Sequence, residues 1–433
     1  MIMKRTFIAL LCLVAATAAS AQQYMRIWQA GNSERVALQD ITYSADGSTL
    51  QVGGKQYSTA GIDSITMVHV ITVNFQGEQA TVDAGNAPGV TYSVNGANVS
   101  IVSTNVKQEL ETVLQGQSRN GSLTYTGPLK CKFTLNGLDL TSTQGPAIDI
   151  QCGKRVALIL APGTQNTLAD AAGGLHKGAF YCKGHVEMEG AGTLTVSGNT
   201  RHAFACKEYL QLKKSTGNII IKKAAADAIH VGQYLLMSGG NITIDENTAC
   251  DGIQVETMLL ADNLTPDPDK EENGKIFIKG GTINAVIAHE DYKGIKNDEG
   301  DVFISGGNIR ILANGNGSRG IQTDGNMTIS ADNGEPQIYI EANGAKCTNT
   351  AVGHDPHRCM GIKVEKNLLV TGGTTTVTNT GKKARGIKVN GTYTKRGGTV
   401  NAVVVPLPRR SRTGFYGLSA SGKRLLTGFD HIL

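Results

Sequence analysis

Residues 250–255 read CDGIQV, and residues 226–231 read ADAIHV. Each phrase places an Asp, a small residue and an Ile in the same order. When the chain is aligned on this apolar residue, which we call the anchor, nine copies appear, most of them 24 to 26 residues apart. The nine anchors are Ile148, Phe180, Phe204, Ile229, Ile253, Ile295, Ile321, Ile362 and Ile387. The wider gaps, such as 253 to 295, contain loop-like insertions.

The residues beside each anchor follow a pattern of their own. The residue before the anchor is always Ala or Gly, as expected where the chain turns tightly against the next repeat. The residue two positions after the anchor is mostly apolar, which predicts an inward-facing column. Asn297 and Thr323 are the polar exceptions, and they fit either an internal polar ladder or a local irregularity.

Two further phrases recur between the anchors. One is a glycine pair followed by alternating apolar residues, as in GGNITI at 239–244 and GGNIRI at 306–311. The other is a short apolar stretch, as in YLQL at 209–212 and YLLM at 234–237. Three short strands in each repeat of ~25 residues are typical of a parallel β-helix. Because each coil buries its apolar residues only against its neighbours, the repeats must form one all-β solenoid.

The segments outside the repeat predict separate roles. Residues 1–21 are expected to be a signal peptide, because Lys4 and Arg5 precede an apolar run and small residues end it. Alternating strand patterns predict a small β module over 22–70 and a β-rich cap or start of the solenoid over 71–127. The β-helix is expected over 128–405, followed by a basic tail at 406–433. The chain is therefore expected to be a soluble exported protein of the periplasm, cell surface or extracellular space, without a transmembrane segment.

The net charge of +5 is unevenly distributed. The last 39 residues contain seven Lys or Arg and one Asp, and Lys4 and Arg5 belong to the expected signal peptide. The remainder of the chain therefore carries a net charge of about −3. A short basic tail can bind acidic polymers, but we interpret this one as a solvated end, and we expect no nucleic-acid partner.

Several phrases together resemble a known family. They are FTLNGLDLTSTQGPAIDIQ at 133–151, APGTQNTLAD at 161–170, GAGTLTVSGN at 190–199, and the recurring D-[AG]-I and GG-x-I-x-I phrases. Over roughly residues 75–402 the chain is similar to the secreted bacterial carbohydrate-binding domain family of right-handed β-helices, which is akin to pectate lyases. The resemblance implies a right-handed helix, binding of plant-type polysaccharides, calcium held by acids near the D-G-I turns, and no general cleaving activity.

Acidic residues at the turns are the candidate metal ligands. Asp227 and Asp251 lie one coil apart, where carboxylates ~5 Å apart repel each other unless they are neutralised. Calcium, which prefers oxygen ligands, would neutralise them, and Asp291, Asp298 and Asp301 add further carboxylates nearby. The alternative is that these are solvated turn residues whose side chains cap the backbone.

Basic and aromatic residues are the candidate carbohydrate contacts. Lys293, Arg319 and Arg385 replace the Asp in later coils, which disfavours calcium there. They are expected to pair with uronate carboxylates, or to act as proton-abstracting groups in a lyase, or to be plain surface charges. Tyr209 and Tyr234 occupy the same position of successive coils, where stacked rings would form either a sugar-binding platform or a simple ladder.

The cysteines offer one candidate disulfide. Cys347 and Cys359 bracket the insertion CTNTAVGHDPHRC, and an oxidising compartment would permit a bond between them. With His354 and His357 they also make a four-ligand zinc set, although the spacing matches no standard motif. Cys182 and Cys206 fall in the inward column and are expected to be core residues.

The sequence favours an exported, non-catalytic, calcium-assisted protein that binds acidic, uronate-rich polysaccharides of plant type. A calcium-dependent pectate-like lyase is the first alternative, and a structural or adhesive surface protein is the second. No catalytic residue is assigned, because a polygalacturonase would be expected to show paired Asp residues and a Gly-His-Gly turn, and the chain has GHV at 184–186. The oligomeric state is not predicted.

Overall fold

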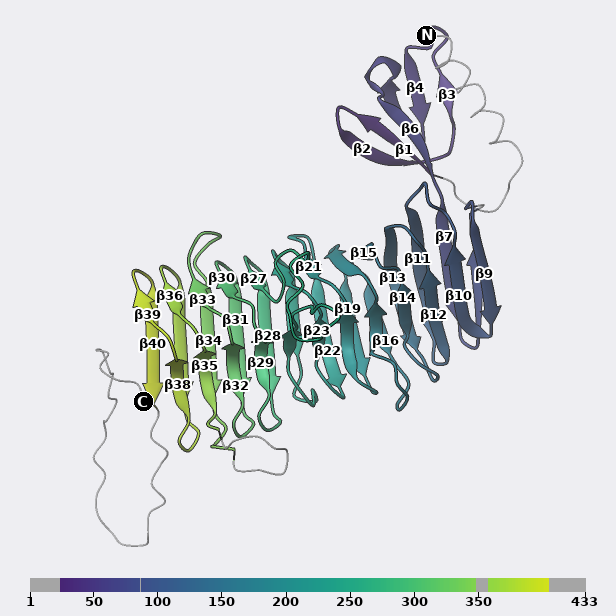
Figure 1. Cartoon of the computed structure of the whole chain (residues 1–433). Helices are drawn as coiled ribbons and strands as arrows, with labels where there is room; N and C mark the ends of the chain where they lie inside the picture. Colours follow the sequence, from purple (N-terminus) through teal and green to yellow (C-terminus); the bar gives the residue numbers. More distant parts are fainter. Residues whose placement is uncertain (1–23, 86, 348–356, 405–433) are drawn as a thin grey trace, which may run out of the picture.

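The computed structural model describes residues 24–85, 87–347 and 357–404. These residues form a parallel β-solenoid with small β-sheets at its N-terminal end, as Figure 1 shows. The predicted all-β parallel solenoid is therefore confirmed. The expected signal peptide (1–21), the tail (406–433) and His354 lie outside the described residues, so those predictions stay predictions. No helix in the described part of the chain has the length and apolar character needed to cross a membrane.

One face of the solenoid is a twelve-stranded sheet. Its strands in chain order are β9 (Val90–Asn95), β10 (Ala97–Ser103), β12 (Gly121–Thr126), β14 (Ile148–Gln151), β17 (Gly178–Cys182), β20 (His202–Cys206), β23 (Ile229–Val231), β26 (Ile253–Val255), β29 (Lys293–Asn297), β32 (Arg319–Thr323), β35 (Met360–Val364) and β38 (Arg385–Val389). All neighbours in this sheet are parallel except β9, which runs antiparallel to β10. Eleven parallel strands, and so about eleven coils, are thus present in the described residues.

The anchors lie in this sheet and stack in register. The nine anchors form eight register pairs between successive coils, from Ile148 with Phe180 to Ile362 with Ile387. Leu123 extends the column by one coil, because it pairs with Ile148. The long insertions leave this register unchanged, since Ile253 still pairs with Ile295.

The remaining faces belong to a second sheet of 22 strands. They are β7 (Val70–Gln76), β8 (Gln79–Asp83), β11 (Leu110–Ser118), β13 (Cys131–Thr141), β15 (Arg155–Leu160), β16 (Gln165–Ala169), β18 (His185–Glu189), β19 (Thr193–Gly198), β21 (Leu210–Leu212), β22 (Asn218–Ala224), β24 (Leu235–Met237), β25 (Asn241–Ile244), β27 (Ile276–Ile278), β28 (Thr282–Ile287), β30 (Val302–Ile304), β31 (Asn308–Ala313), β33 (Met327–Ile329), β34 (Gln337–Ala342), β36 (Leu368–Val370), β37 (Thr374–Asn379), β39 (Tyr393–Lys395) and β40 (Thr399–Val404). In most coils two of these strands correspond to the short apolar phrase and the glycine-pair phrase, and their apolar residues join one continuous core.

The small residue before each anchor is required by the packing on the opposite side of the coil. A Cβ atom added to Gly320 would lie 2.5 Å from Ile340 Cγ2, and one added to Gly361 would lie 2.2 Å from Val377 Cγ1. Earlier coils admit Ala here, and Ala147 and Ala228 are fully buried. The Ala-or-Gly rule therefore reflects how closely the two sheets approach at this corner.

The two polar exceptions of the inward column are bonded inside the solenoid. Asn297 and Thr323 have no exposed surface. The Asn297 amide nitrogen donates to the carbonyl oxygens of Gly274 (2.9 Å) and Gly300 (2.6 Å), and the Thr323 hydroxyl donates to Gly300 at 3.0 Å. The donor groups of both side chains therefore satisfy backbone carbonyls at turns of the solenoid, whereas the Asn297 side-chain oxygen has no hydrogen-bond partner among the described residues.

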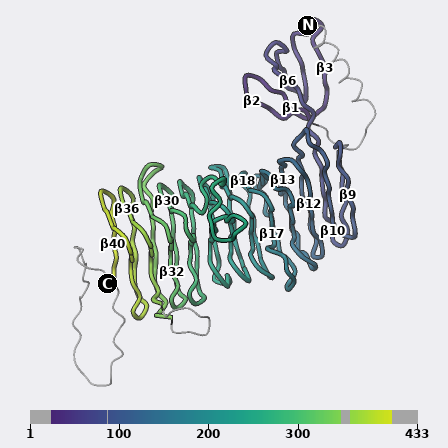
Figure 2. The backbone as a smooth tube through the Cα atoms, viewed as in Figure 1, coloured from purple at the N-terminus to yellow at the C-terminus, as the bar shows by residue number. Residues whose placement is uncertain are grey.

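A separate module precedes the first coil. It holds one sheet of β1 (Tyr24–Gln29), β2 (Asn32–Ala37) and β6 (Ser64–Val68), another of β3 (Thr42–Tyr43), β4 (Thr49–Val52) and β5 (Lys55–Ser58), and a 3-10 turn η1 (Thr59–Gly61). Arg26 and Arg35 form ion pairs of 2.8 and 2.7 Å with Glu111 of β11. Figure 2 shows this module beyond the N-terminal end of the solenoid. At that end β8 pairs antiparallel with β7 and β9 with β10, so these two strands cover the edges of the two sheets.

We predict that Gly320→Ala lowers the unfolding free energy by about 1–3 kcal/mol, because the new methyl group would force Ile340 to move. Gly153→Ala is the matched control, since a Cβ atom at Gly153 meets no atom within 4 Å. Thermal unfolding followed by circular dichroism measures both. Equal melting temperatures for the two variants would contradict the packing explanation.

Candidate functional site

Two adjoining pockets lie on the outer surface of the twelve-stranded sheet, over β17, β20 and β23. Their volumes are about 430 and 410 Å³, and both are lined by Lys177, Tyr181 and Lys207. The larger pocket also reaches His202 and His230. The shared residues make the two pockets one continuous binding surface that crosses several coils, which we call the cationic surface for the charges described next.

Four basic side chains surround the cationic surface. Lys177, Lys183, Arg201 and Lys207 are exposed, and none of them forms an ion pair with another described residue. Tyr181 lies half-buried between them, with the Lys177 ammonium 5.3 Å from its ring centroid. Unpaired cations beside an aromatic ring favour binding of an anionic ligand with an apolar face.

An insertion between β26 and β27 forms one wall of the larger pocket. Met258, Leu259 and Asn263 line the pocket from this insertion. The insertion is tied to the solenoid by Lys270, whose ammonium pairs with Glu208 at 2.9 Å, and by Gln233, which donates to the carbonyl oxygen of Glu271 at 2.8 Å. The wall is therefore held by contacts with coils that precede it in the chain.

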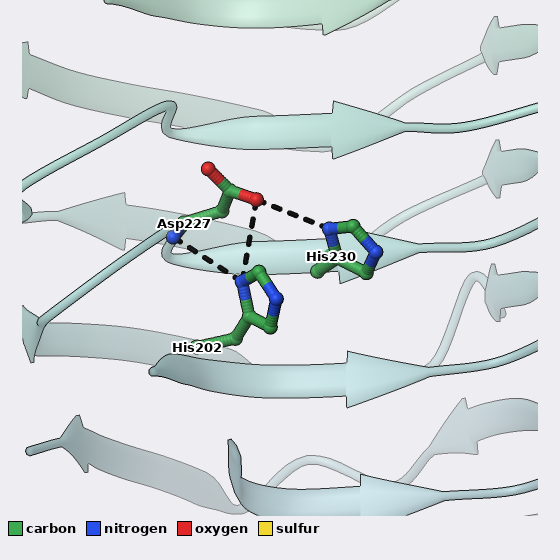
Figure 3. Close-up of side chains that lie close together, drawn as sticks. All are labelled: His202, Asp227 and His230. Atoms are coloured by element: carbon green, nitrogen blue, oxygen red, sulfur yellow. Dashed lines mark hydrogen bonds and ion pairs between the residues drawn. The ribbon is translucent and has the colours of Figure 1, made fainter. Parts of the chain in front are cut away.

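His202 and His230, which line the larger pocket, both contact the buried Asp227 (Figure 3). The Oδ2 atom of Asp227 lies 3.2 Å from Nδ1 of His202 and 3.0 Å from Nδ1 of His230. The two imidazole rings stack with their centroids 4.1 Å apart, and Nε2 of His230 lies 3.5 Å from Glu256. His202 and Asp227 are buried, whereas His230 is half-buried.

The cluster distributes its charge unevenly. Burial acts to lower the pKa of His230, but hydrogen bonds to Asp227 and Glu256 outweigh it and raise that pKa to about 9. Burial lowers the pKa of His202 below its ordinary value, despite its contact with Asp227. Burial would raise the pKa of Asp227, but the two histidines hold it below its ordinary range. These shifts favour the ionised form of Asp227, the protonated form of His230 and the neutral form of His202.

The Asp of the D-[AG]-I phrase has a structural role in the backbone ladder. The backbone N–H of Asp251 donates to Oδ1 of Asp227 at 3.1 Å, and that of Lys293 donates to Oδ1 of Asp251 at 2.7 Å. One coil earlier, the N–H of Asp227 donates to Nδ1 of His202 at 3.3 Å. Each of these side chains therefore accepts the N–H of the corresponding residue of the next coil. The ladder stops at Lys293, which offers no acceptor, and the Arg319 N–H donates to Tyr292 O instead.

The predicted calcium ligands are distributed along the solenoid. In the described residues, one group of three His, Cys, Asp or Glu side chains can hold a metal ion, and it is His202, Asp227 and His230. Asp298 pairs with Lys296 at 2.9 Å, and Asp301 accepts from the backbone N–H of Asn326 at 2.8 Å. Calcium at these aspartates stays a prediction.

The predicted basic contacts lie away from the cationic surface. Lys293 and Arg319 are register partners in β29 and β32, and both lie near the carboxylate of Asp291, at 3.8 and 4.0 Å. Arg319 is only 6% exposed and also bonds Gln322. Arg385 lies two coils further on, as the register partner of Met360.

The predicted tyrosines belong to the other sheet. Tyr209 and Tyr234 precede β21 and β24, and their rings stack at 4.6 Å. His185 extends the stack at 4.2 Å from Tyr209. Tyr234 is 8% exposed, so little of its ring is open to a sugar. The geometry is that of a ladder along the solenoid.

Cys347 and Cys359 lie at the two ends of a segment, 348–356, that is outside the described residues. Both side chains are buried, the Cys347 N–H donates to the carbonyl oxygen of His357 at 2.7 Å, and the Cys359 thiol donates to Ala313 O at 3.4 Å. Their pairing in a disulfide stays a prediction. His357 contacts Asp291.

Sequence reasoning missed the cations of the cationic surface, although a signal for them exists. Lys177 and Lys183 lie three residues before and after the anchor Phe180, and Arg201 and Lys207 lie three residues before and after Phe204. Successive coils are ~4.8 Å apart, so this spacing places four cations at the corners of one patch. This second pattern is separate from the charges at the Asp position of the D-[AG]-I phrase.

We predict that the Asp251 carboxylate stabilises the fold as an acceptor, so Asp251→Ala lowers the unfolding free energy by about 1–3 kcal/mol. Asp251→Asn keeps an oxygen for the Lys293 N–H and is expected to cost less. Thermal unfolding with and without calcium compares the two variants. A larger loss of unfolding free energy in Asp251→Asn than in Asp251→Ala would contradict the role of Asp251 as a backbone acceptor.

We also predict that Glu208 makes the stability of the fold depend on pH in the acid range. A hydrogen bond from His185 and the ion pair with Lys270 lower the pKa of Glu208 to about 2. Because this folded-state pKa is depressed, Glu208 contributes stability above pH ~4.5 and loses it as the pH falls towards 2. Glu208→Gln should therefore lower the melting temperature at pH 7, with the difference from wild type shrinking between pH 4.5 and 2. Glu246→Gln, at an exposed position, is the control. A pH-independent difference would contradict the assignment.

Two comparisons find known proteins that are similar to this chain. A family model described as carbohydrate-binding domain-containing protein matches residues 95–404. No curated protein matches the chain significantly. A solved structure, the polysaccharide lyase-like protein from C. thermocellum in a gadolinium derivative, is 21% identical, with a TM-score of 0.49; the match covers 62% of this chain and 99% of that one. Since the family model spans well over half of the sequence, the chain belongs to the carbohydrate-binding domain-containing family.

Proposed function

We propose that the chain is an exported protein that binds acidic polysaccharides without cleaving them, and that the cationic surface is the binding site. The observation that carries this proposal is the set of four exposed, unpaired cations around Tyr181. Membership of a carbohydrate-binding family supports a glycan as the ligand. The charge supports a uronate-bearing glycan, because Lys and Arg bind carboxylates through charge-assisted hydrogen bonds.

The shape of the cationic surface suits an extended chain. The two pockets adjoin across successive coils, so a polymer lying along the solenoid axis would pass Lys183 and Lys207 in turn. The half-buried Tyr181 ring offers an apolar face for a sugar ring between these charges. Arg201 adds a planar guanidinium, which binds a carboxylate through two parallel hydrogen bonds.

The role of calcium in binding can be tested separately from the location of the site. The Asp227 and Asp251 carboxylates already accept backbone N–H groups, which accounts for their presence without an ion. A calcium ion that bridges protein and uronate carboxylates would make binding sensitive to a chelator, whereas direct pairing with Lys and Arg would make it sensitive to salt. The response to each reagent therefore separates the two modes.

We predict that Arg201→Ala combined with Lys207→Ala weakens binding to polygalacturonate by about tenfold or more, because two charge-assisted contacts are lost. Lys222→Ala combined with Lys223→Ala is the matched control, since it removes the same charge from β22 of the other sheet. Affinity electrophoresis and calorimetry, with neutral glycans in parallel, measure the effect.

Equal weakening by both double variants would contradict the assignment of the site. Absence of binding to every acidic glycan tested would overturn the proposed function and favour an adhesive role. A rise in unsaturated-product absorbance with polygalacturonate would instead show that the chain is a lyase. Repeating the titration with a calcium chelator and at high salt decides which interaction holds the glycan.

A further inference from the structure

We propose that His202, Asp227 and His230 form a binding site for one divalent transition-metal ion of the zinc class beside the larger pocket. Their three ligand atoms all lie within 4.8 Å of one another, and the residues come from two consecutive coils. This site shares the larger pocket with the proposed glycan contacts but uses different residues, and it differs from the calcium expected at the aspartates, because two of its ligands are imidazole nitrogens.

The spacing of the ligand atoms fits a tetrahedral ion. Zn²⁺ binds His nitrogen and carboxylate oxygen at about 2.0–2.2 Å, so ligand atoms in a tetrahedral site lie roughly 3.3–3.5 Å apart. The Asp227 Oδ2 atom lies 3.2 and 3.0 Å from the two Nδ1 atoms. Because the two imidazole rings stack with an interplanar angle of 22°, the rings must rotate to direct both Nδ1 lone pairs at one ion. Figure 3 shows both Nδ1 atoms turned towards the same carboxylate oxygen.

The contacts of His202 bring two acceptor atoms together, Nδ1 of His202 and Oδ2 of Asp227. When Nδ1 accepts the Asp227 N–H at 3.3 Å, its lone pair lies 3.2 Å from the lone pairs of an ionised carboxylate. A proton on Nδ1 would bond that carboxylate but would leave the N–H without this acceptor. A metal ion on Nδ1 would also replace this N–H bond, which is the longest of the three in the ladder, but it would bind Nδ1 and Oδ2 together.

Neighbouring groups supply the outer hydrogen bonds that normally orient metal-bound side chains. Nε2 of His230 lies 3.5 Å from a carboxylate oxygen of Glu256, so this acid would orient the ring with Nδ1 towards the ion. The other carboxylate oxygen of Asp227 is held by the Asp251 N–H. Both histidines line the larger pocket, which leaves the remaining coordination position facing solvent or a ligand oxygen. Two imidazoles and one carboxylate favour zinc-class ions over calcium, which takes oxygen ligands.

The test uses the full chain, freed of metal with a chelator and without an affinity tag. Titration with Co²⁺, followed by visible absorption, and with Zn²⁺, followed by calorimetry, should show one equivalent that excess Ca²⁺ does not displace. His230→Gln should weaken this binding by at least about tenfold, and Glu256→Gln by a smaller factor. His202→Asn removes an imidazole but keeps an acceptor for the Asp227 N–H. His185→Gln, on the other sheet, is the matched control and should bind like wild type.

Absence of one-equivalent binding, or unchanged binding by both His230→Gln and His202→Asn, would overturn the site. Circular dichroism of each variant shows whether it is folded, and Glu256→Gln keeps the test decisive if a histidine variant fails to fold, because Glu256 is exposed. Metal titrations are made without glycan, and glycan binding is measured after chelation. Failure of the metal site and failure of the proposed function therefore give different results.

Discussion

The in-register stacking of one apolar residue per coil is the constraint on which the rest of the molecule depends. A single coil has no core of its own, so every inward side chain is buried only by the coil before it and the coil after it. Ile253 pairs with Ile295 although 42 residues separate them, which shows that the column fixes the register and the loops adapt to it. Because the anchors stay aligned, the residues at each fixed distance from them also form columns on the surface. Any site on this protein is therefore built from residues about one repeat apart in the sequence.

This arrangement gives the Asp of CDGIQV a clear role. Side chains two residues before the anchor face the backbone of the next coil, and Asp227 and Asp251 accept its N–H groups. His202 occupies the corresponding position one coil earlier and accepts the N–H of Asp227. In the same column, Asp251 caps the backbone, whereas His202 and Asp227 belong to the cluster that we propose as a metal site. The difference arises because His230, on the next outward position, adds a second imidazole beside the carboxylate.

Because of the repeat, the fold could be predicted from the sequence, whereas the site could be predicted only in part. The anchors, the small residue before them and the inward column could be predicted because each is repeated in nine coils and follows from burial alone. The cationic surface could not be predicted in the same way, because Lys177 and Arg201 occur in two coils only. The pocket also depends on an insertion whose position over β20 and β23 follows from contacts such as Lys270 with Glu208. Those contacts join residues that no sequence period relates.

The insertion that carries Met258 and Leu259 has a consequence for how binding specificity can change. Its two ends are held by coils whose register is set elsewhere, so its length and composition can vary without moving the residues beneath it. The solenoid strands hold the cations and histidines of the pocket in fixed positions, and the insertion forms a side of the pocket that can be replaced. Grafting a different loop between β26 and β27 would alter which ligands fit into the pocket, while the residues on the solenoid strands stay in place. The protein is in this sense a modular scaffold, in which recognition and folding are encoded by different stretches of the chain.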